Sequence, residues 1–495
     1  MRHIFLIIAL AFCLLASQAQ QQTKQVSLYE AVMIAQEQSI DGLVAKYQYL
    51  ADYWQYRSFK AQLLPSLSLD AKIPSFDRSL NPVQNSVTGE YNYVDNFVLR
   101  NSLGLTLKQN IAATGGSVEL YTGLVRMDQF KPRRLVDYNS SPVSLIYNQP
   151  LGSFNPLKWD KKIEPQKYAK AKYTYLENVQ RIASNVVDYF FAQLTAQQNL
   201  SIAELNHKNT TTLYKISQER FKIGAISQNE LMQLELQLLN QQAAINNNSL
   251  QLNMARARLI SYLGYGDTVS IALEMPEIAR GIEVSAEDAY LLSMHNTSVD
   301  YQNQIKRLEA ERDIAKAKAD RRPQIQFNAR FGLNQVAQDF FGAYRKPMDQ
   351  ESVNLGLKVN IFDGGMAKGR LQMALSKADI VDAEIEKADI DRRQDLFLKV
   401  MQFNNQSLQC AISRRADSVA QKRYELSLEQ FAQGRMSVLE FNTAQSERGQ
   451  AQNSYVVELQ NFWTYFYSIQ RLTLYDFIHR INISEGFDKV TLEKQ

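Results

Sequence analysis

A long internal repeat constrains this chain more than any other feature of its sequence. Around Gly224 and Gly434 the two halves share seven identical residues at a separation of 210 positions: Tyr214/Tyr424, Ser217/Ser427, Glu219/Glu429, Phe221/Phe431, Gly224/Gly434, Ser227/Ser437 and Glu230/Glu440. Earlier segments match at a separation of 258 positions, which pairs Pro65 with Pro323. The separations differ by 48 residues, so the first copy carries an insertion between Pro65 and Val143. Ordered self-similarity of this kind predicts two copies of one structural unit.

Each copy is predicted to begin with a helix. Ser27 and Ser285 resemble N-cap residues, because an acidic side chain follows each of them three positions later. The helices run to about residues 64 and 322, where a proline ends each of them.

Strands are predicted after these prolines. Apolar and polar residues alternate over 66–73 in the first copy and over 324–333 and 353–361 in the second, and a return strand starts at Val143. A period of two residues gives each strand one apolar face and one polar face.

Long helices follow the strands, over about 163–222 and 366–433. At 1.5 Å per residue they would be about 90 and about 100 Å long, and Pro165 is compatible with a first helical turn. Each ends at a glycine that suits a left-handed C-cap. Return helices then complete a helical hairpin in each copy, over about 227–263 and 437–479.

The insertion, within residues 66–142, contains a further alternating run around Leu105. Segment 110–116 echoes segment 360–365, but the chain then turns back into apolar alternation instead of entering a long helix. The pattern fits an extra hairpin, longer strands or an elaborated loop, and these alternatives stay open.

The N-terminus is typical of a secretory signal peptide, predicted over residues 1–19. No later segment reaches the 18 apolar residues of a transmembrane helix. A formal charge of +4 on 495 residues argues against a nucleic-acid surface. Histidine and cysteine residues do not cluster at metal-ligand spacing, and no catalytic constellation or phosphate loop occurs. The chain is therefore predicted to be no enzyme and to hold no cofactor or metal.

Helices of this length cannot be buried in a globule and must pack lengthwise with others. Two short alternating hairpins cannot close a barrel of at least eight strands. Several chains could pool their hairpins into one transmembrane β-barrel, apolar outside and polar inside, and their helices into a tube. An isolated soluble sheet is the competing interpretation of the alternation.

The repeated pattern Phe-x-x-Gly-x-x-Ser-x-x-Glu, at 221–230 and 431–440, resembles the helical-hairpin tips of TolC-type outer-membrane efflux proteins. The prolines that end the first helices, the junction at 360–365 and the C-terminal segment 471–477 fit the same family. The resemblance covers roughly residues 26–480.

The resemblance implies an α+β membrane protein in which a long α-helical coiled-coil barrel joins a transmembrane β-barrel. It implies a homotrimer with a 12-stranded barrel in outer-membrane lipid and a helical tunnel in the periplasm. The family serves as the exit duct of tripartite efflux pumps or type I secretion systems, with a periplasmic adaptor and an inner-membrane transporter of the RND or ABC type as partners. The two repeats would span residues 20–270, with a tip near 224, and 271–495, with a β-hairpin at 323–362 and a tip near 434.

Residue roles follow from the same resemblance. The tips would dock the adaptor or form the turns through Phe221, Gly224, Ser227, Phe431, Gly434 and Ser437. Glu230 and Glu440 occupy the family's positions at the periplasmic entrance constriction, where a ring of carboxylates attracts cations. Helix capping or ordinary surface charge is the alternative for both. Arg435 would join helices at the entrance, or would be exposed to solvent.

Two other classes of protein share part of this pattern. A periplasmic coiled-coil adaptor or scaffold also contains helical hairpins, but it normally has one hairpin with β-rich flanks. A general diffusion porin has no long helices. The doubled hairpin of this chain favours the exit duct over both.

Overall fold

A computed structural model describes residues 24–84, 86–131, 133–265, 271–278, 281–485 and 487. The predicted signal peptide and cleavage site lie outside the described residues. The chain forms two compact units, and each draws on both halves of the sequence. The first unit comprises Ala51–Lys170 and Tyr301–Lys387, and the second unit contains the remaining described segments. The boundary of the two repeats near residue 270 therefore stays a prediction about the sequence.

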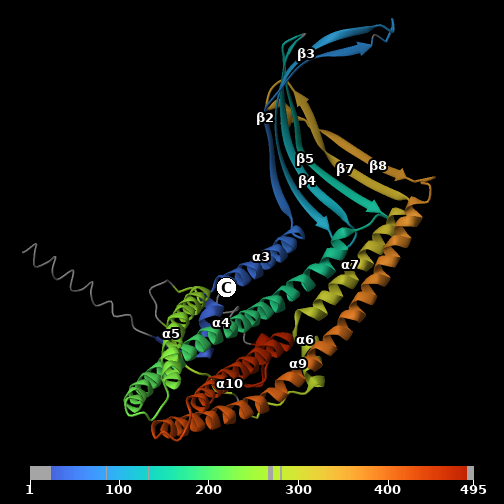
Figure 1. Cartoon of the computed structure of the whole chain (residues 1–495). Helices are drawn as coiled ribbons and strands as arrows, with labels where there is room; N and C mark the ends of the chain where they lie inside the picture. Colours follow the sequence, from blue (N-terminus) through green and yellow to red (C-terminus); the bar gives the residue numbers. More distant parts are fainter. Residues whose placement is uncertain are drawn as a thin grey trace, which may run out of the picture. The chain divides into compact units, whose positions relative to one another are not determined.

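The first unit contains a six-stranded antiparallel sheet formed by the described residues (Figure 1). Its strands lie in the order β2-β3-β4-β5-β7-β8. Their bounds are β2 Ser66–Gln84, β3 Tyr91–Ile111, β4 Gly116–Lys131, β5 Leu135–Leu151, β7 Gln324–Ala337 and β8 Met348–Lys358. The predicted strand at 353–361 therefore ends at Lys358, three residues early. The insertion is an extra hairpin, because β3 and β4 are joined by a turn at 112–115 and stand between β2 and β5.

The strands of the insertion are also longer than the alternation predicted. β2 and β3 continue to pair as far as Gln84 with Tyr91, whereas the pairing of β3 with β4 ends at Phe97 with Lys131. The β2–β3 hairpin therefore extends beyond the neighbouring strands (Figure 1). Two of the three open alternatives, an extra hairpin and longer strands, thus occur together.

The predicted first helix of each copy is broken in two, so the prediction of single helices was wrong. The first copy has α2 Leu28–Gln38 and α3 Ile40–Gln62, and the second has α6 Ala286–Asn296 and α7 Ser298–Asp320. The extended residues between them, Ser39 and Thr297, are 258 positions apart. The Ser39 hydroxyl accepts a hydrogen bond from the Gly42 amide at 3.0 Å and so caps the next helix.

The long helices are α4 Pro156–Lys222 and α9 Met366–Ala432, each of 67 residues, and their returns are α5 Gln228–Tyr262 and α10 Val438–Thr473. Two predicted details were wrong. Pro165 lies inside α4, because the helix already begins at Pro156, where a proline fits the first turn. α10 ends before His479, because Leu474 adopts the left-handed conformation with φ 46° and the Asp476 carboxylate then accepts from the amides of residues 478 and 479.

The second unit has the larger hydrophobic core. Phe190 of α4, Phe403 of α9 and Phe462 of α10 lie fully buried in it. The short parallel pair of β1 Lys24–Val26 and β6 Ile271–Leu273 joins the beginnings of the two halves beside this core. No helix in the described part of the chain is long and apolar enough to cross a membrane.

Candidate functional site

The two helical-hairpin tips have the same backbone geometry. Gly224 has φ 75° and Gly434 has φ 78°, a left-handed conformation that glycine adopts without steric cost. At the first tip the Gly224 amide donates to Phe221 and the Ala225 amide to Arg220, both at 2.9 Å. The second tip repeats both bonds at the same lengths. These paired bonds form a Schellman motif, which satisfies the last carbonyls of α4 and α9.

Each return helix begins with a complete capping box. The Ser227 amide donates to the Glu230 carboxylate at 2.9 Å, and the Glu230 amide donates back to the Ser227 hydroxyl at 3.2 Å. Ser437 and Glu440 make the same pair of bonds at 2.9 and 3.2 Å. The two glutamates thus cap their helices, which was one of the two alternatives for them. Their place at a pore entrance stays a prediction.

The capping bonds also set the acidity of the two glutamates. Hydrogen bonds from the backbone and hydroxyl of the serine lower the pKa of Glu230 and of Glu440, because they favour the charged carboxylate. The contribution of these bonds to the stability of the folded state is complete at pH values above the pKa that the two carboxyls have in the unfolded chain. It is lost as the pH falls through the lowered pKa of the folded state.

Replacing Ser437 with alanine should loosen the first turn of α10. The N-cap acceptor is lost, which costs about 1 kcal/mol and raises amide exchange there about fivefold. Hydrogen exchange by mass spectrometry measures this, and Ser437→Thr, which keeps the hydroxyl, is the matched control. Acidification should deprotect the same amides in the wild type but not in Glu440→Gln, which has no charge to lose. Unchanged exchange in Ser437→Ala would contradict the capping role.

The structure brings the two tips together in one small apolar cluster. We define the tip cluster by its six buried side chains, Leu213, Leu234, Tyr424, Phe431, Val438 and Phe441, which come from all four long helices. Polar contacts cross between the two hairpins beside it. Asn209 donates to the Tyr424 hydroxyl at 2.8 Å, and Gln237 donates to Gln445 at 2.6 Å.

The equivalent tip residues differ in exposure. Phe221 is 40% exposed and its neighbour Ile223 is 80% exposed, whereas Phe431 is 4% exposed and packs against Phe441 with ring centres 5.4 Å apart. Phe431 therefore supports the turn from inside, whereas Phe221 and Ile223 expose apolar surface at the first tip.

Arg220 links the two tips, and sequence reasoning missed it. Its guanidinium donates to the Phe431 carbonyl at 3.5 Å, and a Cβ atom added to Gly434 would collide with it. Arg435, for which a role in joining helices and solvent exposure were the two alternatives, has an exposed side chain. The sequence carries one signal for the role of Arg220, which is a difference between the two repeats. Position 220 holds arginine, whereas its counterpart at position 430 holds glutamine.

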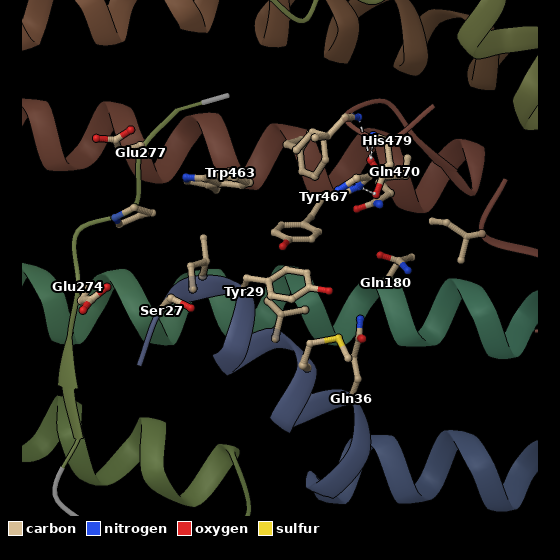
Figure 2. Close-up of a pocket in the computed structure, with 18 of the residues that line it drawn as sticks. Ser27, Tyr29, Gln36, Gln180, Glu274, Glu277, Trp463, Tyr467, Gln470 and His479 are labelled. Carbon is tan, nitrogen blue, oxygen red and sulfur yellow. Dashed lines mark hydrogen bonds and ion pairs between the residues drawn. The ribbon is translucent and has the colours of Figure 1, made fainter. Parts of the chain in front are cut away.

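A cavity of about 530 Å³ lies between α2, α4, α10 and the segments after β6 and α10 (Figure 2). Trp463 and Tyr467 line it, and burial raises the pKa of the Tyr467 hydroxyl.

The aromatic run at 462–467 packs into the core of the second unit, with Phe462 and Phe466 fully or nearly buried. Within the described ranges, no group of three or more His, Cys, Asp or Glu side chains could hold a metal ion.

A family model matches more than half of the chain. The model of the family described as "Outer membrane efflux protein" matches residues 131–265 and 301–463. No curated protein matches the chain in sequence.

Several solved structures share the fold. The Campylobacter jejuni CmeC outer membrane channel has a TM-score of 0.66 at 14% identity, covering 93% of this chain and 88% of that one. The Vibrio cholerae outer membrane protein VceC has a TM-score of 0.63 at 12% identity, covering 90% and 95%. The open state of the Neisseria gonorrhoeae MtrE outer membrane channel has a TM-score of 0.60 at 13% identity, covering 90% and 88%.

Proposed function

Because the chain belongs to the outer membrane efflux protein family, we propose that it is the exit duct of a tripartite efflux pump or a type I secretion system. The family is one of outer membrane efflux proteins and not of enzymes. The duct conducts substrates passively across the outer membrane. A periplasmic adaptor and an inner-membrane transporter of the RND or ABC type supply the coupling and the energy.

The observation that carries this proposal is the sheet of the first unit. Exposed apolar residues cover one face of it, and its outer strands β2 and β8 are exposed along nearly their whole length. Such a sheet is stable in lipid only when its edges are paired with other strands. We therefore propose a homotrimer whose sheets close one β-barrel in the outer membrane, while the helices form a tunnel in the periplasm.

The hairpin tips are proposed as the adaptor-docking end. The apolar side chains of Phe221 and Ile223 are exposed at the turn between α4 and α5. In the proposed trimer the helices lie in the periplasm, where a protein partner can contact these side chains. Glu230, Glu440 and Arg435 belong to the same end and are proposed to line the entrance constriction.

Deleting the gene should raise sensitivity to some toxic compound or block export of some protein.

Ile223→Asp should give the same defect as deletion of the gene, because a charge replaces an apolar contact at the docking surface, while Ile223→Ala should give a milder defect. The control Gln433→Asp adds the same charge at the equivalent position of the second tip, where a polar residue already stands. Growth on a broad compound panel and the mass of the detergent-extracted complex are the measurements. Normal export by Ile223→Asp would remove the docking role, and a soluble monomer would exclude the duct.

A further inference from the structure

The two halves contribute unequal numbers of strands to the sheet. The first copy supplies β2, β3, β4 and β5, and the second supplies β7 and β8. A trimer with the 12-stranded barrel that the resemblance implies would need four strands per chain, whereas the described sheet has six. Either the extra hairpin belongs to the barrel wall or it stands apart from it.

Hydrogen bonds fasten the extra hairpin to the helices that enter and leave the sheet. Asn155, the residue before α4, donates to the Ala112 carbonyl in the β3–β4 turn at 2.8 Å and accepts from the Lys158 amide at 3.2 Å. On the other side, Gln109 donates to the Leu63 carbonyl at 3.0 Å, just after α3. The turn is therefore held at the same end of the sheet as the helix junctions.

An apolar row crosses the extra hairpin without interruption. Five residues lie opposite one another on adjacent strands from β2 to β7, namely Leu67, Leu107, Leu120, Leu145 and Phe331. All five are exposed, by 40–65% of their surface. A hairpin outside the barrel wall would have no reason to continue the lipid-facing pattern of its neighbours.

The opposite face of the same strands is polar. Lys108 of β3 and Glu119 of β4 stand opposite each other one position from the apolar row and form an ion pair at 2.8 Å. Arg330 of β7 lies on the same face, opposite Ile146 of β5, which in turn lies opposite Glu119. A charged face behind an apolar row is the arrangement of a barrel wall around a water-filled lumen.

We infer that the assembled duct has an 18-stranded outlet barrel, in which β8 of each chain pairs with β2 of the next. This inference rests on the proposed trimer. The direction of the strands permits it, because an even number of antiparallel strands per chain brings β8 and the next β2 together antiparallel.

The larger barrel changes which solutes can leave. With strands about 4.8 Å apart and tilted by about 40°, 18 strands give a backbone width of roughly 36 Å, against roughly 24 Å for 12 strands. The outlet of this duct is about 1.5 times as wide, so it suits solutes of larger cross-section than a 12-stranded outlet admits.

Cysteine cross-linking in membranes tests which strands meet between chains. Leu355→Cys on β8 is combined, one at a time, with cysteines at lipid-facing positions of β2 (67, 69, 71 and 73) or of β4 (118, 120 and 122). Facing residues on neighbouring strands have Cβ atoms about 4.5–5.5 Å apart. A small shift brings two cysteines there to the roughly 3.5–4.5 Å that a disulfide needs after oxidation. The variant with Leu355→Cys alone is the control for the buried Cys410.

Ladders of linked dimers and trimers from a β8–β2 pair, together with a native mass of three chains, would support the 18-stranded barrel. Ladders from a β8–β4 pair would overturn it, because β2 and β3 would then lie outside a 12-stranded wall, and would leave the exit-duct function intact. A native mass of two chains would also overturn it, since two sheets make only 12 strands. A monomer would instead contradict the proposed function. Electron microscopy of the unmodified complex gives the strand count, and a 12-stranded wall with β3 and β4 standing apart from it would also overturn the inference.

Discussion

Replacing Gly434 with proline is expected to abolish export while the complex still assembles. Gly434 has φ 78°, and its amide donates to the Phe431 carbonyl at 2.9 Å. Proline holds φ near −65° and has no amide hydrogen, so the turn loses both its conformation and its bond, at a cost of about 3 kcal/mol or more. The members of the main core nearest to it in sequence are Cys410 and Val456, so the damage should stay at the tip.

Alanine variants separate the two causes of this defect. Gly434→Ala and Gly224→Ala both force alanine into the left-handed region, at a cost of about 1–2 kcal/mol each. Only Gly434→Ala also meets the Arg220 guanidinium, whereas the space around Gly224 is open. Gly434→Ala should therefore be the more harmful variant, and Arg220→Ala should rescue part of its defect. Hydrogen exchange at the tip and export measure the effect, and normal export by Gly434→Pro would remove the functional role of this turn.

Replacing Phe462 with alanine should destabilise the second unit by about 3–5 kcal/mol, since it removes a fully buried ring and leaves a cavity. Phe462 lies in the main core, with the ring centre of Phe403 5.3 Å away. Opening of the core should become roughly two to three and a half orders of magnitude more frequent, at about 1.4 kcal/mol for each factor of ten.

Cys410 offers a native reporter for this experiment. It lies in the same core, 1% exposed, with its thiol at 3.2 Å from the Glu458 carbonyl. Burial raises the pKa of the Cys410 thiol to about 11, so the folded protein should label very slowly with a thiol reagent. The labelling rate of Phe462→Ala should rise with the opening frequency. The control Phe341→Ala, at a residue that is 78% exposed, should leave the rate unchanged. Equal rates in both variants would contradict the assignment of Phe462 to the core.

Sequence patterns predicted most of the regular structure because they reflect local physics. The serine caps, the tip glycines and the alternating strands were readable, since capping bonds, left-handed turns and two-faced strands each require particular residues nearby. The helix starts and ends were less certain. α4 starts at Pro156 and not near Pro165, because Asn155 caps the chain there, and the pair Asn155-Pro156 is itself a local helix-start signal.

Features that depend on contacts between distant segments could not be predicted in this way. The position of Arg220 beside Gly434 follows from how the two hairpins pack, and no local pattern encodes it. The same reason explains why Phe221 and Phe431, identical in the repeat, differ in burial. The break at Ser39 is different, because the segment Ser39-Ile-Asp-Gly42 carries a local capping signal that was not used.

The shared helix breaks also establish an order of events in the history of this gene. Ser39 and Thr297 interrupt equivalent helices at the same offset as the other matches between the halves. A break inherited by both halves existed in the single ancestral unit before that unit was duplicated. The β3–β4 hairpin occurs in one half only, and so does the arginine at position 220. These differences were fixed after the duplication, so the two descendants of one ancestor have since diverged in both the sheet and the tips.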